Sequence, residues 1–173
     1  PGRPGLTSME LCRSLGLLTG SLALVTILIA LSTDFWFVAM GPTFSSHSGL
    51  WPEKSNSEVP GYIRATQSLS ILAALSALVS VIFLILSYVP SLSIRGYGPL
   101  SSSIMAFAAA IFAVVAMAVY TSERWNQPRH PQIQTFFSWS FYLGWVSAVL
   151  CLCTGSLSLH AHCSGPQSGY ETL

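Results

Sequence analysis

The side chains best suited to metal or acid–base chemistry lie near the C-terminus, where His160, His162 and Cys163 stand close together. Imidazole and thiolate both ligate zinc, but a structural zinc site usually takes four ligands, and no carboxylate stands nearby. Histidines at the interfacial end of an apolar helix are the alternative interpretation, and we adopt it. The chain also offers no Ser-His-Asp set and no carboxylate pair within a plausible pocket. The sequence therefore predicts no catalytic, metal-binding or cofactor-binding residues.

The chain ends in a short polar tail, Gly169-Tyr170-Glu171-Thr172-Leu173. A Tyr-x-x-Leu tetrapeptide preceded by glycine resembles the lysosomal sorting signal that clathrin adaptors read, which is an address and adds no membrane affinity. Capture of the terminal carboxylate by a PDZ domain is the alternative, and Glu171 disfavours it because serine or threonine is commoner at that place. We therefore predict that Gly169, Tyr170 and Leu173 are sorting residues and that a cytosolic adaptor is a partner.

Two of the four cysteines, Cys12 and Cys163, flank predicted helices at the terminal ends of the chain. Cysteines in that position are candidates for S-palmitoylation, with an unmodified thiol as the alternative. Cys151 and Cys153 lie in the middle of a predicted helix, where cysteine packs as a small apolar side chain. Neither long polar loop contains a cysteine, so the loops hold no disulfide of their own.

The elements that position these residues follow from the distribution of charge. The chain has 173 residues, of which 51% are apolar and only 8% are charged. Four intervals without Asp, Glu, Lys or Arg, namely 14–33, 65–94, 96–122 and 130–170, are each at least 20 residues long. A membrane-spanning helix needs about 20 predominantly apolar residues. The sequence therefore predicts an all-α membrane protein with four transmembrane helices, and it shows no basic cluster that would bind nucleic acid.

We expect residues 9–160 to form the membrane domain, with a cytosolic tail over 161–173. The predicted helices cover about 15–33, 66–89, 102–120 and 137–159, and the predicted lumenal loops cover 34–62 and 121–135. Residues 1–8, rich in proline and glycine ahead of Met9, are interpreted as an expression scar or an alternative leader outside the fold.

Small residues mark the predicted helix contacts. Gly16 and Gly20 form a Gly-x-x-x-Gly pair in the first helix, and Ala106, Ala110 and Ala113 give the third helix a small-residue face. Such spacings let helix backbones approach closely in lipid. The glycine pair serves either a dimer contact or packing within the same chain, and we favour packing within the chain.

The first loop begins with Phe35, Trp36 and Phe37, aromatic residues typical of the membrane–water interface. Short runs over 35–40 and 48–51 are candidate strands of a small sheet. In the second loop, the neighbouring Glu123 and Arg124 suggest an ion pair, which contributes on the order of 0–1 kcal/mol if it is exposed.

Four helices place both termini on one side of the membrane. The positive-inside rule disfavours cytosolic termini, because the terminal side carries Arg13 and Arg95, whereas the loop side carries Lys54, Arg64, Arg124 and Arg129. The tail argues the other way, since clathrin adaptors are cytosolic. We give the tail more weight and predict that both termini are cytosolic.

Several motifs resemble the claudin and peripheral-myelin-protein-22 superfamily of tetraspan proteins, over Met9 to Leu159. They are Ser32-Thr33-Asp34-Phe35-Trp36, Gly49-Leu50-Trp51, Ile63-Arg64-Ala65-Thr66 and Phe141-Tyr142-Leu143-Gly144-Trp145. The resemblance implies a left-handed four-helix bundle with a small extracellular or lumenal β-sheet, and motif roles for Trp36, Gly49, Leu50, Trp51 and Arg64. Claudins carry two loop cysteines after Gly-Leu-Trp; here Pro52 follows, so disulfide-braced junction strands are not expected.

The tail and the runs 121–125 and 131–140 resemble more closely one superfamily member of cytotoxic lymphocyte granules. This implies a non-enzymatic organiser of membrane partners in lysosome-related granules, which supports granule exocytosis and reaches the plasma membrane on secretion. Its expected partners are the lipid bilayer, the adaptor and other granule membrane proteins. Claudin-like adhesion at the cell surface is the alternative. A transporter or pore is disfavoured, because ionisable residues inside spans commonly mark such paths and the predicted spans have none of Asp, Glu, Lys or Arg.

Overall fold

The protein is described here by a computed structural model covering residues 4–52, 58–89, 91–92 and 97–165, with the backbone alone for residues 4–7. Its described residues form four long helices and three short strands. The helices are α1 (Pro4–Ser32), α2 (Gly61–Leu86), α3 (Gly98–Trp125) and α4 (Trp139–Ser164). The strands are β1 (Phe37–Met40), β2 (Ser45–Ser48) and β3 (Gln134–Phe137).

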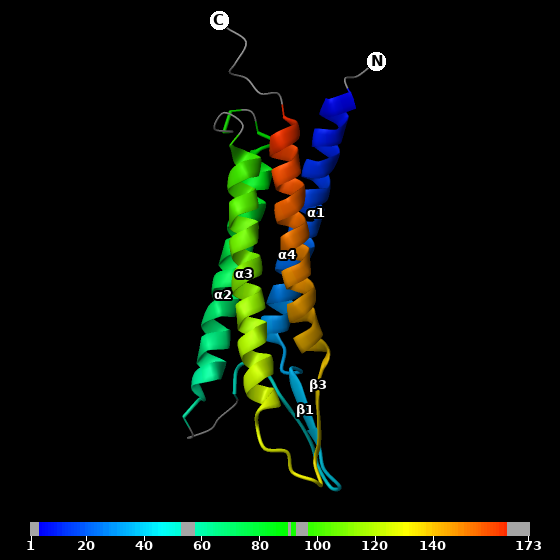
Figure 1. Cartoon of the computed structure of the whole chain (residues 1–173), viewed down its shortest axis with the longest axis vertical. Coiled ribbons are helices and arrows are strands. Elements are labelled where there is room, and N and C mark those ends of the chain that lie inside the picture. The colour runs from blue at the N-terminus through cyan, green and yellow to red at the C-terminus, as the bar shows by residue number, and fades with distance from the viewer. Residues whose placement is uncertain (1–3, 53–57, 90, 93–96, 166–173) are drawn as a thin grey trace, which may run out of the picture.

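The four helices lie side by side as one bundle, with the start of α1 and the end of α4 at one end of it and the strands at the other (Figure 1). Each contains a stretch of 25 to 28 residues that is long and apolar enough to cross a membrane. At 1.5 Å per residue these stretches reach about 38–42 Å, which exceeds the roughly 30 Å of bilayer hydrocarbon. The predicted architecture, four spanning helices with a small sheet, is confirmed.

The helix ends differ from those expected from charge alone. α1 begins at Pro4, within the segment interpreted as a leader, and α3 runs on through charged residues to Trp125. Charged residues stop a helix from lying in lipid, but they do not stop it from continuing into water. α4 begins at Trp139, after the expected start at 137, because β3 occupies the preceding residues.

The helices pack as a ring in which α1 contacts α4 and α2, and α3 contacts α2 and α4. Alanines fill the interior: Ala106, Ala110 and Ala113 of α3 are all at most 3% exposed. Large side chains such as Ile104 and Ile111, on the other face of α3, point outward. This distribution suits lipid as the surrounding medium, where close packing of small residues holds helices together.

The two glycines of α1 face the same chain. A Cβ at Gly20 would lie 3.2 Å from Thr154 Cγ2 of α4 and 3.2 Å from Val81 Cγ2 of α2. A Cβ at Gly16 would lie 3.5 Å from Ser158 Oγ. The absence of a side chain at position 20 therefore lets α4 pack closely against α1 at this turn.

Hydroxyl groups add hydrogen bonds between helices inside the bundle. Ser80 Oγ of α2 donates to the carbonyl of Ser102 in α3 over 2.9 Å, and Ser103 Oγ donates to the carbonyl of Gly155 in α4 over 2.9 Å. Each bond satisfies a polar group that lipid could not. These contacts link α3 to both of its neighbours.

The sheet has strand order β2-β1-β3, and both pairings are antiparallel. β2 lies at Ser45–Ser48 rather than at the expected 48–51, so that Gly49-Leu50-Trp51 follows the strand. β3 comes from the second loop and was not predicted. In its register Phe37 lies opposite both Ser48 and Phe137, so β1 joins the two loops in one cap.

Candidate functional site

The end of α1 is closed by two tryptophans. Trp36 is 1% exposed, and its Nε1 donates to the carbonyl of Ala30 over 2.6 Å. Trp51 Nε1 donates to the carbonyl of Leu31 over 2.8 Å, although its ring is 46% exposed. The last carbonyl groups of a helix have no hydrogen-bond donor within the helix, and the two indole N–H groups donate to two of these carbonyls.

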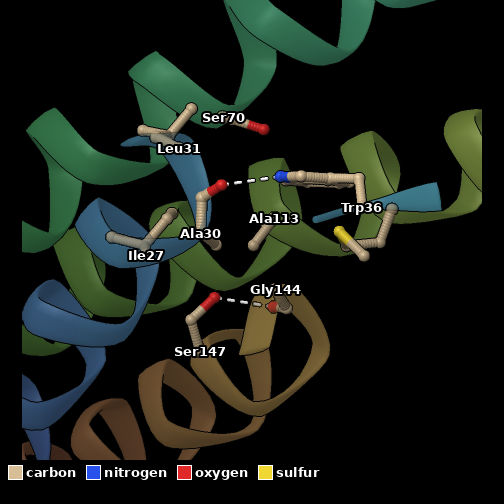
Figure 2. A pocket seen from close by; sticks show the side chains of 9 residues that line it. Ile27, Ala30, Leu31, Trp36, Ser70, Ala113, Gly144 and Ser147 are labelled. Atoms are coloured by element: carbon tan, nitrogen blue, oxygen red, sulfur yellow. Dashed lines mark hydrogen bonds between the residues drawn. The ribbon is translucent and has the colours of Figure 1, made fainter. Parts of the chain in front are cut away.

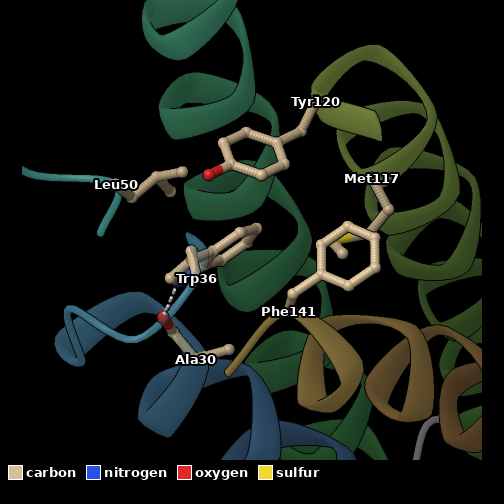
Figure 3. Close-up of a cluster of buried hydrophobic side chains, with 6 residues drawn as sticks. All are labelled: Ala30, Trp36, Leu50, Met117, Tyr120 and Phe141. Atoms are coloured by element: carbon tan, nitrogen blue, oxygen red, sulfur yellow. Dashed lines mark hydrogen bonds between the residues drawn. The ribbon is translucent and has the colours of Figure 1, made fainter. Parts of the chain in front are cut away.

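Trp36 also forms the centre of an aromatic cluster between the cap and the bundle (Figure 3). It meets the ring of Tyr120 edge-on at 5.1 Å and the ring of Phe141 edge-on at 6.5 Å between centroids. Leu50 and Met117 complete the buried cluster, which draws on α1, the first loop, α3 and α4. The cluster fastens the sheet to the helices through contacts between rings.

Gly49 allows the first loop to return to the end of α1. A Cβ at this position would lie 2.6 Å from Asp34 Cα and 2.9 Å from the Thr33 carbonyl oxygen. Both are backbone atoms, which cannot rotate away. The glycine therefore sets the close approach that lets Leu50 enter the cluster and Trp51 reach Leu31.

Arg64, the remaining predicted motif residue, is exposed near the start of α2 and lies outside this cluster. The loop carbonyl of Leu50 is instead bound by Gln67 Nε2 over 2.6 Å. Sequence reasoning did not single out Gln67. It stands one turn after Arg64, on the side of α2 that meets the loop.

Arg124 is a second residue whose place the sequence did not reveal. Its guanidinium carbon lies 4.5 Å from the centroid of the Phe37 ring, 5.6 Å from that of Tyr120 and 5.9 Å from that of Tyr62. Glu123, its expected ion-pair partner, is exposed. Arg124 thus contacts the cap through cation–π geometry, which contributes about 0.5–2 kcal/mol depending on desolvation. Its position one turn after Tyr120 is the signal that could have suggested this.

Beneath the cluster lies a small interior cavity of about 10 Å³, lined by residues that include Ile27, Trp36, Ser70 and Gly144 (Figure 2). That volume is about the minimum for one water molecule. A Cβ at Gly144 would lie 2.6 Å from Met117 Sδ, so the helices close tightly here. This cavity has no room for an organic ligand.

Of the histidines and cysteines near the C-terminus, His160 contacts a different helix, α1. His160 Nδ1 lies 3.4 Å from Cys12 Sγ of α1 and 3.3 Å from Ser164 Oγ. Cys163 is exposed on α4. Within the described part of the chain, no group of three or more His, Cys, Asp or Glu side chains could hold a metal ion. Palmitoylation of Cys12 or Cys163 stays a prediction.

Arg13 joins α1 to α2 at the end of the bundle opposite the strands. Its Nη1 donates to the carbonyl of Ser87 over 3.4 Å, and its guanidinium lies 4.2 Å from the centroid of the Tyr88 ring. Ser87 caps the C-terminus of α2, where a cation interacts favourably with the helix dipole. The predicted sorting residues Gly169, Tyr170 and Leu173 lie outside the described residues.

Comparison with known proteins identifies the fold. The family model described as PMP-22/EMP/MP20/Claudin family matches residues 11–158. Protein NKG7 of Homo sapiens is 71% identical over 165 residues, covering 95% of this chain and 100% of that protein. Protein NKG7 of Bos taurus is 61% identical over the same coverage. Lens fiber membrane intrinsic protein of Homo sapiens is 28% identical over 155 residues, covering 85% of this chain and 89% of that protein.

The family match covers α2, α3, both loops and most of α1 and α4, and it includes every residue of the aromatic cluster. It confirms the resemblance drawn from the tryptophan and Gly-Leu-Trp motifs. This chain is a tetraspan membrane protein, and it belongs to the PMP-22/EMP/MP20/Claudin family.

Proposed function

We propose that this chain is a non-enzymatic tetraspan protein of lysosome-related cytotoxic granules, where it organises membrane partners and supports granule exocytosis in lymphocytes. It would reach the plasma membrane when granules fuse. The observation that carries the proposal is the tail Gly169-Tyr170-Glu171-Thr172-Leu173. The match to Protein NKG7 of three mammals over 95% of this chain adds support, because this is the granule protein that the tail and the runs 121–125 and 131–140 resemble.

The position of the tail suits a sorting role. α4 ends at Ser164, so Tyr170 follows the last helical residue by only a short polar segment. The start of α1 and the end of α4 lie at one end of the bundle, opposite the sheet (Figure 1). If adaptors bind the tail, both termini are cytosolic and the cap of strands faces the granule lumen.

An organising role agrees with where the side chains of the bundle point. The interior is filled by small residues, and the cavity below Trp36 holds about 10 Å³. Large apolar side chains cover the outside of the helices, among them Leu18, Leu75 and Ile111. Contacts with lipid and with other membrane proteins would use these outer faces and the cap, without a chemical step.

The test is the location of Tyr170→Ala in cytotoxic lymphocytes. We expect this variant to leave the granules and accumulate at the plasma membrane, because the adaptor loses its tyrosine contact. Glu171→Ala is the matched control, since it changes a tail position that the signal leaves open. Granule residence of Tyr170→Ala equal to the wild type would contradict the sorting role.

The exocytosis role has a separate readout. Cells lacking the protein should release less granule content on target contact, and the wild-type chain should restore release. Glu171→Ala should restore it equally, whereas Tyr170→Ala should not, because it would be absent from the granule. Normal release without the protein would contradict this part of the proposal.

Adhesion at the cell surface is a second candidate, favoured by membership of the claudin family. It predicts steady-state enrichment at contacts between cells and binding between caps of opposing cells. Imaging of the protein in resting cells separates the two candidates, since a strictly intracellular distribution contradicts adhesion.

A further inference from the structure

A cleft of about 480 Å³ lies in the cap, between the strands β1 and β3 and the connection 126–133. Its volume is typical of sites for small organic molecules. The aromatic cluster does not explain it, because only Phe137 is shared between the cleft lining and the residues packed in that cluster. The cleft is therefore a feature of the cap in its own right.

Two arginines line the cleft. Arg129 lies with its guanidinium carbon 4.7 Å from the centroid of the Trp125 ring. Arg124 Nη2 lies 3.4 Å from Ser48 Oγ in a long hydrogen bond, whereas its Nε is buried beneath the surface of the cleft. The acidic residue beside it, Glu123, is exposed and lies outside the lining. Two guanidinium groups beside one cleft favour an anionic ligand, above all a phosphate or carboxylate.

Besides the polar residues Gln127, His130 and Thr135, the rest of the lining is largely apolar or aromatic, and it continues onto the outer surface of the helices. Phe136 and Tyr142 line the cleft and are 45% and 58% exposed. Tyr142 is followed on the same face of α4 by Val146 and Val149, both exposed, at the i, i+4 and i+7 spacing of one helix stripe. An apolar path therefore leads from the cationic cleft along the outside of α4.

We propose that this cleft binds the headgroup of an anionic phospholipid from the membrane leaflet on the side of the cap. The lipid phosphate lies against Arg124 and Arg129, and the first part of an acyl chain follows Tyr142 and Val146 along α4. Cations in the cleft together with an apolar path along α4 fit an amphiphile better than a free anion. A free anion would make no apolar contact with Phe136, Tyr142 or Val146.

The proposal is tested with the purified full-length chain in nanodiscs or detergent. The probe is phosphatidic acid, compared with phosphatidylcholine of the same acyl chains, and binding is read by native mass spectrometry or by titration of a fluorescent lipid. We expect preference for phosphatidic acid. Equal binding of the two lipids overturns the proposal.

Variants locate the site. Arg129→Gln should weaken phosphatidic acid binding about fivefold to tenfold, because it removes a charge-assisted contact. Arg64→Gln is the matched control: it removes an exposed arginine from the same end of the bundle, outside the cleft, and should change binding less than about twofold. If both variants lost the same amount of phosphatidic acid affinity, general surface charge would explain the binding, and the proposed site would be wrong.

Arg124 also braces the cap, so its test needs two variants. Arg124→Lys keeps the charge and Arg124→Gln removes it, and thermal unfolding shows whether each remains folded. We expect Arg124→Gln to bind phosphatidic acid more weakly than Arg124→Lys, since a lysine ammonium still attracts phosphate. Equal binding by two folded variants contradicts a role for this charge.

Competition identifies the kind of ligand. Millimolar inorganic phosphate should leave lipid binding largely intact, and Tyr142→Ala should lower the preference for long acyl chains over short ones. Full displacement by inorganic phosphate would make the cleft a simple anion site. Displacement by an acidic peptide, with no effect of Tyr142→Ala, would make it a peptide groove. Either outcome overturns the lipid proposal.

Discussion

Trp36 and Trp51 donate to consecutive carbonyls at the end of α1, and they differ in what surrounds them. Trp36 is buried, so loss of its N–H would leave the Ala30 carbonyl unpaired at a cost of about 1–3 kcal/mol. Trp51 is half exposed, and water can replace its bond. Trp36 therefore contributes more to the stability of the cap than Trp51 does.

Gly49 offers a sharp test of the cap at the scale of one residue. Gly49→Ala should lower the thermal unfolding midpoint and reduce the yield of folded protein, because its Cβ would meet the backbone of Asp34 at 2.6 Å. Overpacking of this kind typically costs about 1–3 kcal/mol. Unfolding of the detergent-purified protein measures the effect.

Gly61→Ala is the control for that substitution. Position 61 opens α2, and apart from its own local backbone no atom of the described residues lies within 4 Å of the Cβ that alanine would add there. Alanine is also the better helix former, so Gly61→Ala should be neutral or slightly stabilising. Equal destabilisation by both variants would contradict the close approach of the loop to α1.

At the scale of helices, the contact between α1 and α4 depends on Gly20. Gly20→Leu should force the two helices apart, since Thr154 and Val81 lie 3.2 Å from the first added carbon. We expect a loss of thermal stability of about 1–3 kcal/mol. Gly16→Ala meets Ser158 Oγ at an ordinary 3.5 Å and should be tolerated.

The same pair distinguishes packing within the chain from dimerisation through this face. Light scattering of the purified variants gives their oligomeric state. If Gly20→Leu lowered the molar mass of the particle without lowering stability, the glycine would serve a contact between chains instead.

The elements differ in how far sequence reasoning could reach them. The helices could be predicted because charged residues are excluded from lipid, so each span appears in the sequence as a long interval without charge, such as 65–94. β3 could not, because Phe136 and Phe137 look the same in sequence whether they begin an interfacial helix or pair with β1. The polar strand Ser45–Ser48 likewise has no alternating pattern, and pairing with β1 alone defines it.

The site shows the same limit. Trp36, Gly49, Leu50 and Trp51 could be selected by their motifs, and the structure places them together at the end of α1. Arg64 belongs to another of the predicted motifs, and it is exposed and lies outside the cluster. Arg124 reaches the cap because α3 continues one turn past Tyr120. The charge pattern could not predict this, because it ends the predicted helix before the first charged residue.

For the molecule as a whole, the backbone hydrogen bonds between β1 and β3 hold the two loops together. This association does not require the covalent connection between α3 and β3. A protease that cuts once within 126–133 would leave a fragment of β3 and α4 hydrogen-bonded to β1 and packed against α1 and α3. Such a nicked protein should still migrate as one particle in mild detergent and separate into two pieces only on denaturation. The chain should then also assemble from two separately translated halves divided at that connection.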